Sequence, residues 1–341
     1  MATLHPRQVR LLAQTLTPAK LRNFARVWAS FHRSRRKGQA LHRGMPVKVG
    51  FEPTTYCNLR CPECPSGLRS FTRDTGLADL TLFRSAVDQL QRELVYLLLY
   101  FQGEPYLHPH FLEMVSYART RNLYVATSTN GHYLSEAKAR ETVASGLSEV
   151  IVSVDGATQA TYEAYRKGGD LRKVKQGIRH LMAARQAAGS LHPYVILQFL
   201  VVRPNQHEID AIRALGRELG VDKVALKTAQ VYDYEHGHPL IPTLDRYSRY
   251  RRGADGRYHL KNPLDNQCWK LWYGAELTWD GQVLPCCFDK DAQHAMGSLQ
   301  TEAFADIWRS PAYDDFRNRL LRSRAEIDIC RNCSEGTRVW G

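Results

Sequence analysis

Apolar residues recur in two patterns along this chain, and from about residue 46 the two patterns alternate. Short apolar runs typical of strands occupy 47–51, 96–101, 124–128, 150–154, 194–202 and 223–227. Between them, spacings of three and four predict helices near 81–93, 110–121, 135–145, 170–188 and 206–219. Strands that alternate with helices indicate parallel βαβ units. The pattern therefore predicts an α/β fold, a partial (β/α)6 barrel of the TIM type with its chemistry at the carboxyl ends of the strands.

The segment before this alternation, residues 1–45, predicts a helical extension. Thr17 is a typical N-cap followed by proline, and apolar residues then recur at Leu21, Phe24, Trp28 and Phe31. The basic run 33–38 ends the helix. Three interpretations of its apolar face stay open: packing against the barrel, docking on an anionic membrane surface, and binding of nucleic acid or another acidic partner.

The alternation stops after about residue 245, and a different organisation follows. Residues 249–261 are polar and glycine-containing, which predicts a linker between the barrel, 46–248, and a final domain, 262–341. In that domain, Asp280 and Gly281 form a typical turn between two short apolar runs. The sequence therefore predicts a small C-terminal domain with a hairpin at 274–285.

Composition and charge narrow the class of protein. The 341 residues are 43% hydrophobic and 24% charged, as in ordinary globular proteins. The longest apolar run is eight residues, 94–101, whereas a membrane span needs about 20. Without an apolar signal segment, we expect a cytoplasmic protein, and the basic N-terminal helix leaves open a peripheral location at the inner face of the membrane. The net charge is +13. Residues 1–50 contain eleven basic residues and no acidic residue, so the rest of the chain is nearly neutral.

The eight cysteines fall into two clusters, which indicates two metal sites rather than a disulfide framework. Cys57, Cys61 and Cys64 form a C-x3-C-x2-C motif directly after the first predicted strand. Three thiolates in one short loop suit a metal or iron–sulfur cluster with one coordination position left open. A structural zinc ion is the alternative.

This motif closely resembles that of the radical S-adenosylmethionine (SAM) superfamily. The resemblance implies a [4Fe–4S] cluster on Cys57, Cys61 and Cys64, whose fourth iron binds the amino and carboxylate groups of SAM. Reduction then cleaves SAM to a 5′-deoxyadenosyl radical, which abstracts hydrogen from a substrate. Glu63 stands where the family often has an aromatic residue near the adenine.

Polar residues at the other strand ends extend the resemblance. The sequence Gln-Gly-Glu-Pro at 102–105 is similar to the family's Gly-Gly-Glu-Pro motif, in which a carboxylate and close backbone approach receive the amino group of SAM. The resemblance implies further SAM contacts from the ends of the third and fourth strands and just beyond. The expected SAM-binding residues are Gly103, Glu104, Asn130, Ser153, Asp155 and Arg166.

The second cysteine cluster has a four-thiolate set that fits zinc or iron–sulfur equally on spacing. C-x12-G-x4-C followed by a distant C-x2-C resembles the SPASM/Twitch extension of radical SAM oxidoreductases. The resemblance implies an auxiliary [4Fe–4S] cluster on Cys268, Cys286, Cys330 and Cys333, with Cys287 as a spare buried thiol or in exchange with Cys286.

These features predict a radical SAM oxidoreductase that dehydrogenates a hydroxylated small molecule and passes an electron to the auxiliary cluster. A proton acceptor is then needed, and the named candidates are Lys227, Glu235 and Asp289, with Tyr232, His236 and His238 also in range. One alternative is a maturase that modifies a peptide side chain, and others are a zinc-stabilised nucleic-acid-binding protein and an electron-transfer protein. Expected partners are a flavodoxin- or ferredoxin-type reductant and the small-molecule or peptide substrate; nucleic acid is not expected.

Overall fold

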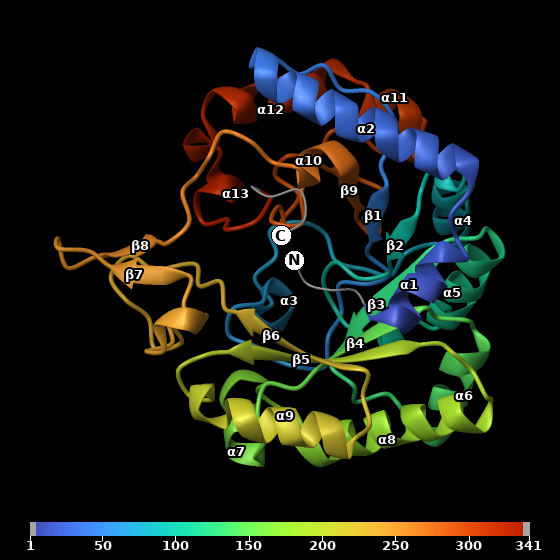
Figure 1. The fold of residues 1–341 in the computed structure, drawn as a ribbon, viewed down its shortest axis with the longest axis vertical. Coiled ribbons are helices and arrows are strands. Elements are labelled where there is room, and N and C mark those ends of the chain that lie inside the picture. Colours follow the sequence, from blue (N-terminus) through green and yellow to red (C-terminus); the bar gives the residue numbers. More distant parts are fainter. Residues whose placement is uncertain (1–4, 337–341) are drawn as a thin grey trace. The chain divides into compact units, whose positions relative to one another are not determined.

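The computed structural model describes residues 5–336, which form two compact units. Unit 1 comprises 5–56, 71–126 and 264–336, and unit 2 comprises 57–70 and 127–263. The four-part division expected from the sequence groups these residues differently and stays a prediction. Each unit contains parallel strands with helices between them, so the predicted α/β class is confirmed (Figure 1).

Unit 1 contains the first three predicted strands: β1 (Lys48–Phe51), β2 (Tyr96–Leu98) and β3 (Tyr124–Thr129), the last three residues of which belong to unit 2. These strands are parallel, with Lys48 opposite Tyr96 and Tyr96 opposite Tyr124. The remaining helices of unit 1 are α1 (Pro6–Ala13), α2 (Pro18–Lys37), α4 (Leu80–Leu90), α5 (Phe111–Thr120), α10 (Lys270–Tyr273), α11 (Phe304–Trp308), α12 (Pro311–Arg322) and α13 (Asp328–Arg331), with short 3₁₀ turns at Pro105–Leu107 and Arg324–Glu326.

The predicted C-terminal hairpin is present, and it also joins the strands of the N-terminal half. Strand β9 (Gly274–Leu277) pairs antiparallel with β10 (Val283–Leu284), as the turn at Asp280-Gly281 predicts. In addition, β9 lies parallel to β1, with Lys48 opposite Gly274. Gly50 leaves room for the carboxylate of Glu276, which a Cβ atom at this position would overlap. Residues more than 200 positions apart therefore share one sheet.

Unit 2 contains β4 (Glu149–Ser153), β5 (Tyr194–Val201) and β6 (Lys223–Thr228), which are parallel as predicted. Helices α8 (Leu171–Ala187) and α9 (Ile209–Glu218) lie along these strands (Figure 1). The unit also holds α3 (Pro65–Leu68), α6 (Glu136–Ala144), α7 (Gln159–Tyr165) and the 3₁₀ turns Gln206–Glu208 and Asp245–Tyr247. The sequence pattern missed α7, a two-turn helix that begins at the capping box of Thr158 and Thr161.

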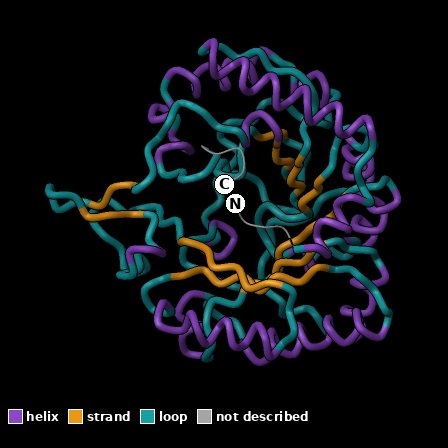
Figure 2. The backbone as a smooth tube through the Cα atoms, in the orientation of Figure 1, coloured by secondary structure: helices purple, strands orange, loops and turns teal. Residues whose placement is uncertain are grey.

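Residues expected as a linker form a two-stranded antiparallel ribbon instead. Strand β7 (Tyr250–Arg252) pairs with β8 (Tyr258–Leu260) around a glycine-containing turn. Figure 2 shows the pair as two orange strands set apart from β4, β5 and β6 of the same unit. The ribbon is anchored by Tyr250, which is buried and whose hydroxyl bonds both backbone groups of Val231.

Helix α2 begins and ends where the sequence predicts. The Thr17 hydroxyl accepts the N–H of Lys20, and Gly38 ends the helix at a φ of +62°. Its apolar face is packed within unit 1, because the Phe31 ring lies 5.2 Å from Trp269 and 5.5 Å from Trp272. Trp28 lies outside this contact and is 44% exposed. No helix within residues 5–336 is long and apolar enough to span a bilayer.

Two substitutions on this helix distinguish packing from surface exposure. Phe31→Ala removes a buried aromatic ring and is expected to lower the free energy of unfolding by about 3–5 kcal/mol. Trp28→Ala, the matched control, is expected to change it by less than about 1 kcal/mol because its ring is half exposed. Urea unfolding followed by circular dichroism measures both, and equal losses would contradict this packing.

Candidate functional site

The three cysteines of the first motif lie in an irregular loop between β1 and the short helix α3. Within unit 2, Cys61 is buried and Cys57 and Cys64 are half-buried. Pro65 begins α3 immediately after Cys64. Gly67 packs directly on the loop, since a Cβ atom there would lie 2.5 Å from the backbone nitrogen of Cys61. The local sequence therefore folds the loop back on itself.

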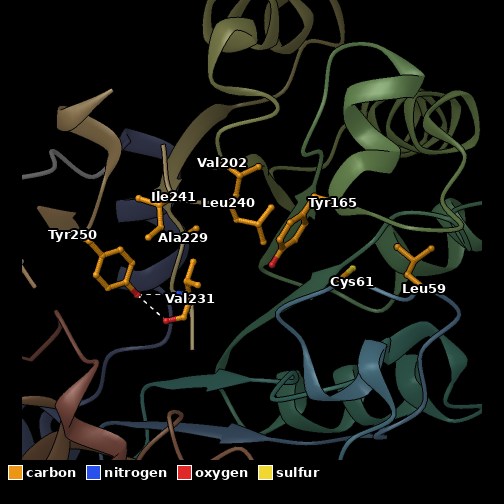
Figure 3. Packing of buried hydrophobic residues seen from close by; sticks show 9 residues of the cluster. All are labelled: Leu59, Cys61, Tyr165, Val202, Ala229, Val231, Leu240, Ile241 and Tyr250. Atoms are coloured by element: carbon orange, nitrogen blue, oxygen red, sulfur yellow. Dashed lines mark hydrogen bonds between the residues drawn. The ribbon is translucent and has the colours of Figure 1, made fainter. Parts of the chain in front are cut away.

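The apolar side of this loop belongs to a core cluster of unit 2. Leu59 and Cys61 pack in that cluster with Tyr165 and with apolar residues that follow β5 and β6 (Figure 3). Burial raises the pKa of the Cys61 thiol, and the guanidinium of Arg166 opposes this rise. One side of the loop is therefore buried among apolar residues, and the positive charge of Arg166 acts on the sulfur of Cys61.

The positive charge beside Cys61 comes from Arg166, which forms an ion pair with Asp155. Arg166 Nε lies 2.5 Å from Asp155 Oδ2, and Arg166 Nη1 lies 3.8 Å from Cys61 Sγ. The other carboxylate oxygen of Asp155 accepts the N–H of Leu200 at 2.7 Å, and Asp155 is fully buried. Asp155 was expected to face a ribose and Arg166 a carboxylate of SAM. In the structure they bind each other beside the cysteine loop.

Asn130 and Ser153 occupy the predicted strand ends. Asn130, which follows β3, donates from Nδ2 to Asn58 Oδ1 at 2.8 Å and lies 3.9 Å from Cys57 Sγ. Ser153 is the last residue of β4 and is buried. Asn130, Asp155 and Arg166 are therefore brought together around the first cysteine motif, all within unit 2.

The Gln-Gly-Glu-Pro turn belongs to unit 1 and packs on the stretch that leads into the cysteine loop. The N–H of Glu104 donates to the Tyr56 carbonyl at 2.7 Å, and the Glu104 side chain is buried. Gly103 has a φ of +73°, and a Cβ atom there would lie 2.2 Å from the Thr54 carbonyl oxygen. Only glycine permits this approach. The glycine thus allows the turn to pack on Thr54, and its approach to the amino group of SAM stays a prediction.

The candidate proton acceptors lie in different surroundings. Lys227 in β6 and Glu235 are exposed residues of unit 2. Asp289 belongs to unit 1 and is buried, and its two oxygens accept the N–H groups of Gln293 and His294 at 2.8 and 2.9 Å. This arrangement is typical of a carboxylate that holds a turn. The structure does not bring the three residues together within one unit.

Sequence reasoning missed a contact that Glu63 makes from within the cysteine motif. Glu63 Oε2 accepts the N–H of Tyr232 at 3.0 Å, and Glu63 Oε1 lies 3.6 Å from His238 Nε2. Glu63 therefore joins the cysteine loop to the stretch that follows β6. Its departure from the family's aromatic residue was the available sign of another role at this position.

The second cysteine set is assembled in unit 1 from segments that follow different elements. Cys268 precedes α10, Cys286 and Cys287 follow β10, and Cys330 lies in α13, two residues before Asn332-Cys333. Cys268, Cys330 and Cys333 are buried, and none of the eight cysteines forms a disulfide. Burial, and then the neighbouring Cys268, raises the pKa of Cys330 to about 12. All five of these cysteines belong to unit 1, and their assignment as ligands of one cluster stays a prediction.

Two cations accompany these thiols. Arg324 is fully buried and donates to the carbonyls of Gln267 and Glu335 at 3.2 and 2.7 Å. Burial alone lowers its pKa, but the thiolates of Cys268 and Cys333 raise it above the ordinary value. Lys270 behaves in the same way beside Cys287 and Cys286, and its ammonium pairs with Glu335. Negative charge on the sulfurs is therefore compensated from two sides.

The adjacent pair Cys286 and Cys287 are not equivalent. Their thiols are hydrogen-bonded to each other, which raises the pKa of Cys286 and lowers that of Cys287 to about 5. Lys270 and Lys48 also favour the Cys287 thiolate. The sequence assigned the ligand role to Cys286 and the spare role to Cys287, and both assignments stay predictions.

The side chains gathered in the two cysteine regions can be compared with the ligands that iron–sulfur clusters require. Among residues 5–336, no group of three or more His, Cys, Asp or Glu side chains is arranged at metal-binding distances. The donors that gather in each region are nonetheless thiols, the ligands of iron–sulfur clusters, and buried or half-buried cations lie beside both groups. The chemistry of both cysteine groups therefore fits an iron–sulfur cluster.

A buried ion pair follows β1 in unit 1 and was also missed. Glu52 is fully buried and receives Arg73 through two bonds of 2.7 and 2.8 Å, together with the N–H of Trp279. Arg73 also donates to the Lys290 carbonyl at 3.0 Å. The pair thus ties the end of β1 to the stretch that carries Cys286 and Cys287. Partners separated by 227 residues leave no sign in local sequence patterns.

Comparisons with known proteins agree with this arrangement. Residues 51–214 match the family model described as the radical SAM superfamily, and residues 268–334 match the iron–sulfur cluster-binding domain SPASM. A mycofactocin maturase, MftC, of Mycobacterium ulcerans is 31% identical over 309 residues, which cover 84% of this chain and 80% of the relative. The chain belongs to the radical SAM superfamily.

Other relatives of this radical SAM protein place it among SPASM-containing members. The PqqA peptide cyclase of Gluconobacter oxydans is 29% identical over 319 residues, covering 87% of this chain and 85% of the relative. The crystal structure of BtrN in complex with AdoMet and 2-DOIA has a TM-score of 0.54 at 21% identity, covering 86% of this chain and 95% of BtrN. The likeness to BtrN shows a shared fold. The SPASM match favours iron–sulfur over zinc for the second cysteine set, a choice that spacing left open.

The Asp155–Arg166 pair of this radical SAM protein generates a stability prediction. Asp155→Asn leaves Arg166 beside a buried loop without its counter-charge, and we expect a loss of about 3–5 kcal/mol in the free energy of unfolding. The control is Asp210→Asn, since the Asp210–Arg213 pair is exposed and contributes less than about 1 kcal/mol. Comparable losses from the two variants in urea titrations would show that the pair does not stabilise this region.

Glu276 generates a pH prediction. Burial, together with the Cys287 thiolate, raises its pKa from 4.5 to about 8. A carboxyl whose pKa is raised on folding stabilises the fold below its unfolded pKa and loses that effect as pH rises. The thermal midpoint of the native protein should therefore fall between pH 4.5 and pH 8 relative to that of Glu276→Gln. Glu326→Gln, at an exposed position, should follow the native protein, and parallel curves for all three would contradict the assignment.

Proposed function

We propose that this chain is a radical SAM maturase that modifies a side chain of a peptide. The observation that carries the proposal is the extent of its likeness to two relatives. The PqqA peptide cyclase and the mycofactocin maturase align over 87% and 84% of this chain and over 85% and 80% of their own lengths. Both domains of this chain, and the region between them, take part in that likeness.

The dehydrogenation of a hydroxylated small molecule, the function first expected from the sequence, has weaker support. It depends on the likeness to BtrN, which at 21% identity concerns the fold alone. Two relatives with higher sequence identity, 29% and 31%, are named as a peptide cyclase and a maturase. The peptide alternative is therefore the better-supported reading.

In this proposal, Cys57, Cys61 and Cys64 hold the cluster at which SAM binds, and Cys268, Cys286, Cys330 and Cys333 hold one auxiliary cluster. When bound, these groups supply one-electron chemistry that removes a hydrogen atom from the substrate. The SAM-binding residues of the proposal are those expected from the sequence: Gly103 and Glu104 in unit 1, and Asn130, Ser153, Asp155 and Arg166 in unit 2.

The chain's own residues then have distinct tasks. Arg166 neutralises negative charge at Cys61 while Asp155 holds its guanidinium in place. Lys227, Glu235 and Asp289 stay the candidate proton acceptors, and both Asp289 oxygens already accept backbone N–H groups. A flavodoxin- or ferredoxin-type protein supplies electrons, and the reaction takes place in the cytoplasm.

Anaerobic assays with SAM, a reductant and synthetic peptides test the proposal. The peptides are those encoded by short reading frames beside the gene. We expect one of them to increase 5′-deoxyadenosine formation and to lose hydrogen atoms, as seen by mass spectrometry. The variant Cys57→Ala/Cys61→Ala/Cys64→Ala should do neither. Stimulation by sugars or cyclitols, with none by any peptide, would overturn the proposal in favour of small-molecule dehydrogenation.

A further inference from the structure

The outer face of α2 carries a row of arginines. Arg22, Arg26, Arg33 and Arg36 are spaced so that they share one side of the helix, opposite the buried Val27 and Phe31. All four are exposed. Because the buried side of α2 already packs on α10, this charged side is the one that the helix presents outward from unit 1.

The row borders a groove of about 800 Å³. We call it the arginine groove, and it is lined by Arg26, Trp28, Ala29, Ser30, His32, Arg33, Arg36, Lys37, Leu41 and Arg43. A second, smaller hollow of about 240 Å³ shares Arg26 and adds Arg22, Arg92 and Arg309. Glu93 is the one acidic residue among the described lining residues of the two. The surface is therefore concave and strongly positive.

These cations lack counter-charges within the described part of the chain. Arg26, Arg33, Arg36, Lys37 and Arg43 take part in no ion pair there, whereas exposed arginines such as Arg121 and Arg179 do pair with acids. Unneutralised charges that line a concave surface produce a focused positive potential. Such a potential attracts an acidic macromolecule and speeds its association.

The position of the groove indicates what kind of acidic partner it serves. The helix that carries it rests on the residues that follow Cys268: the Phe24 and Phe31 rings lie 6.3 and 5.2 Å from the Trp269 ring. The guanidinium carbon of Arg35 lies 5.9 Å from the centre of Phe31. The helix α2 itself and one aromatic layer therefore lie between the charged face and Cys268, a proposed ligand of the auxiliary cluster. Electron transfer weakens steeply with distance, so a docking site for an electron carrier needs this proximity.

A membrane is the less suitable occupant. Amphipathic helices bind bilayers by inserting their apolar face, and that face of α2 is occupied by Trp269 and Trp272. On the outer side of α2, the exposed large apolar residues are Leu21 and Trp28. A concave surface also matches a protein better than it matches a flat bilayer.

We propose that the arginine groove docks a small acidic electron-carrier protein that exchanges electrons with the auxiliary cluster. The inference rests on the proposed function, because it requires that cluster. In the step considered, a reduced flavin carrier gives up one electron and the cluster gains one, with no bond to substrate formed or broken. The arginines bind carboxylates of the carrier, and Trp28 and Leu41 supply apolar contact.

Binding of an acidic bacterial flavodoxin to the anaerobically purified holoprotein tests the proposal. Fluorescence anisotropy of labelled flavodoxin gives the affinity, which should fall as salt rises. The variant Arg26→Glu/Arg33→Glu/Arg36→Glu should weaken binding by about tenfold or more, since three favourable charge contacts become repulsive. The matched control is Arg140→Glu/Arg172→Glu/Arg213→Glu, with the same change in net charge on exposed side chains of unit 2, and it should bind like the native protein.

A second measurement separates docking from loss of the clusters. Stopped-flow oxidation of flavodoxin hydroquinone should be slowed in the groove variant, while reduction by dithionite and iron content should be unchanged. Equal flavodoxin affinity in native and groove variant would overturn the proposal. So would a groove variant that loses binding only to phosphatidylserine vesicles, which would indicate a membrane site. A native protein without dithionite-reducible clusters would instead refute the proposed function, and the affinity measurement would still decide whether flavodoxin docks.

Discussion

Sulfur ligands gathered in a protein interior need positive charge close by, and this requirement organises much of the structure. At the first motif the charge comes from Arg166, which reaches Cys61 and is itself held by the buried Asp155. At the second set it comes from Arg324 and Lys270. Thiolates that face one another in a low-dielectric region repel strongly, so an isolated group of them would resist ionisation. Each cysteine region therefore depends on cations from elements outside its own motif.

Distant segments of unit 1 meet through a strand pairing, a buried ion pair and an aromatic contact. The C-terminal cysteines of unit 1 follow β9 and β10, and β9 pairs with β1 across the Gly50–Glu276 contact. Glu52, two residues after Gly50, then binds Arg73 and the backbone of Trp279. The N-terminal helix α2 completes unit 1 by covering Trp269 and Trp272 with Phe31. Its remaining face carries the charges that give the chain its net positive character. In our proposals, that charge binds a partner protein, while the cysteine regions hold the groups that carry out the reaction.

Local patterns predicted those parts of the fold that local physics determines. The strands β1 to β5 have apolar runs whose residues are mostly buried, and Thr17 and Gly38 bound α2 by satisfying its end groups. The polar residues at strand ends could be located because parallel strands bring their carboxyl ends to one edge. Local patterns contained no sign of β9 beside β1, of Arg73 on Glu52, or of Asp155 paired with Arg166, because those contacts join residues that only the folded chain brings together. Residues 249–261 show the reverse case: a polar stretch that suggests a linker forms a ribbon because Tyr250 is buried against Val231.

The central claim is that the two cysteine groups hold separate iron–sulfur clusters, and iron content with Mössbauer spectroscopy tests it most directly. Anaerobically purified native protein should contain about eight iron atoms per chain, as expected for two [4Fe–4S] clusters. Cys57→Ala/Cys61→Ala/Cys64→Ala and Cys268→Ala/Cys330→Ala/Cys333→Ala should each retain about half of that iron, as a single [4Fe–4S] cluster. Loss of all iron from either variant, or stoichiometric zinc in the native protein, would contradict the account.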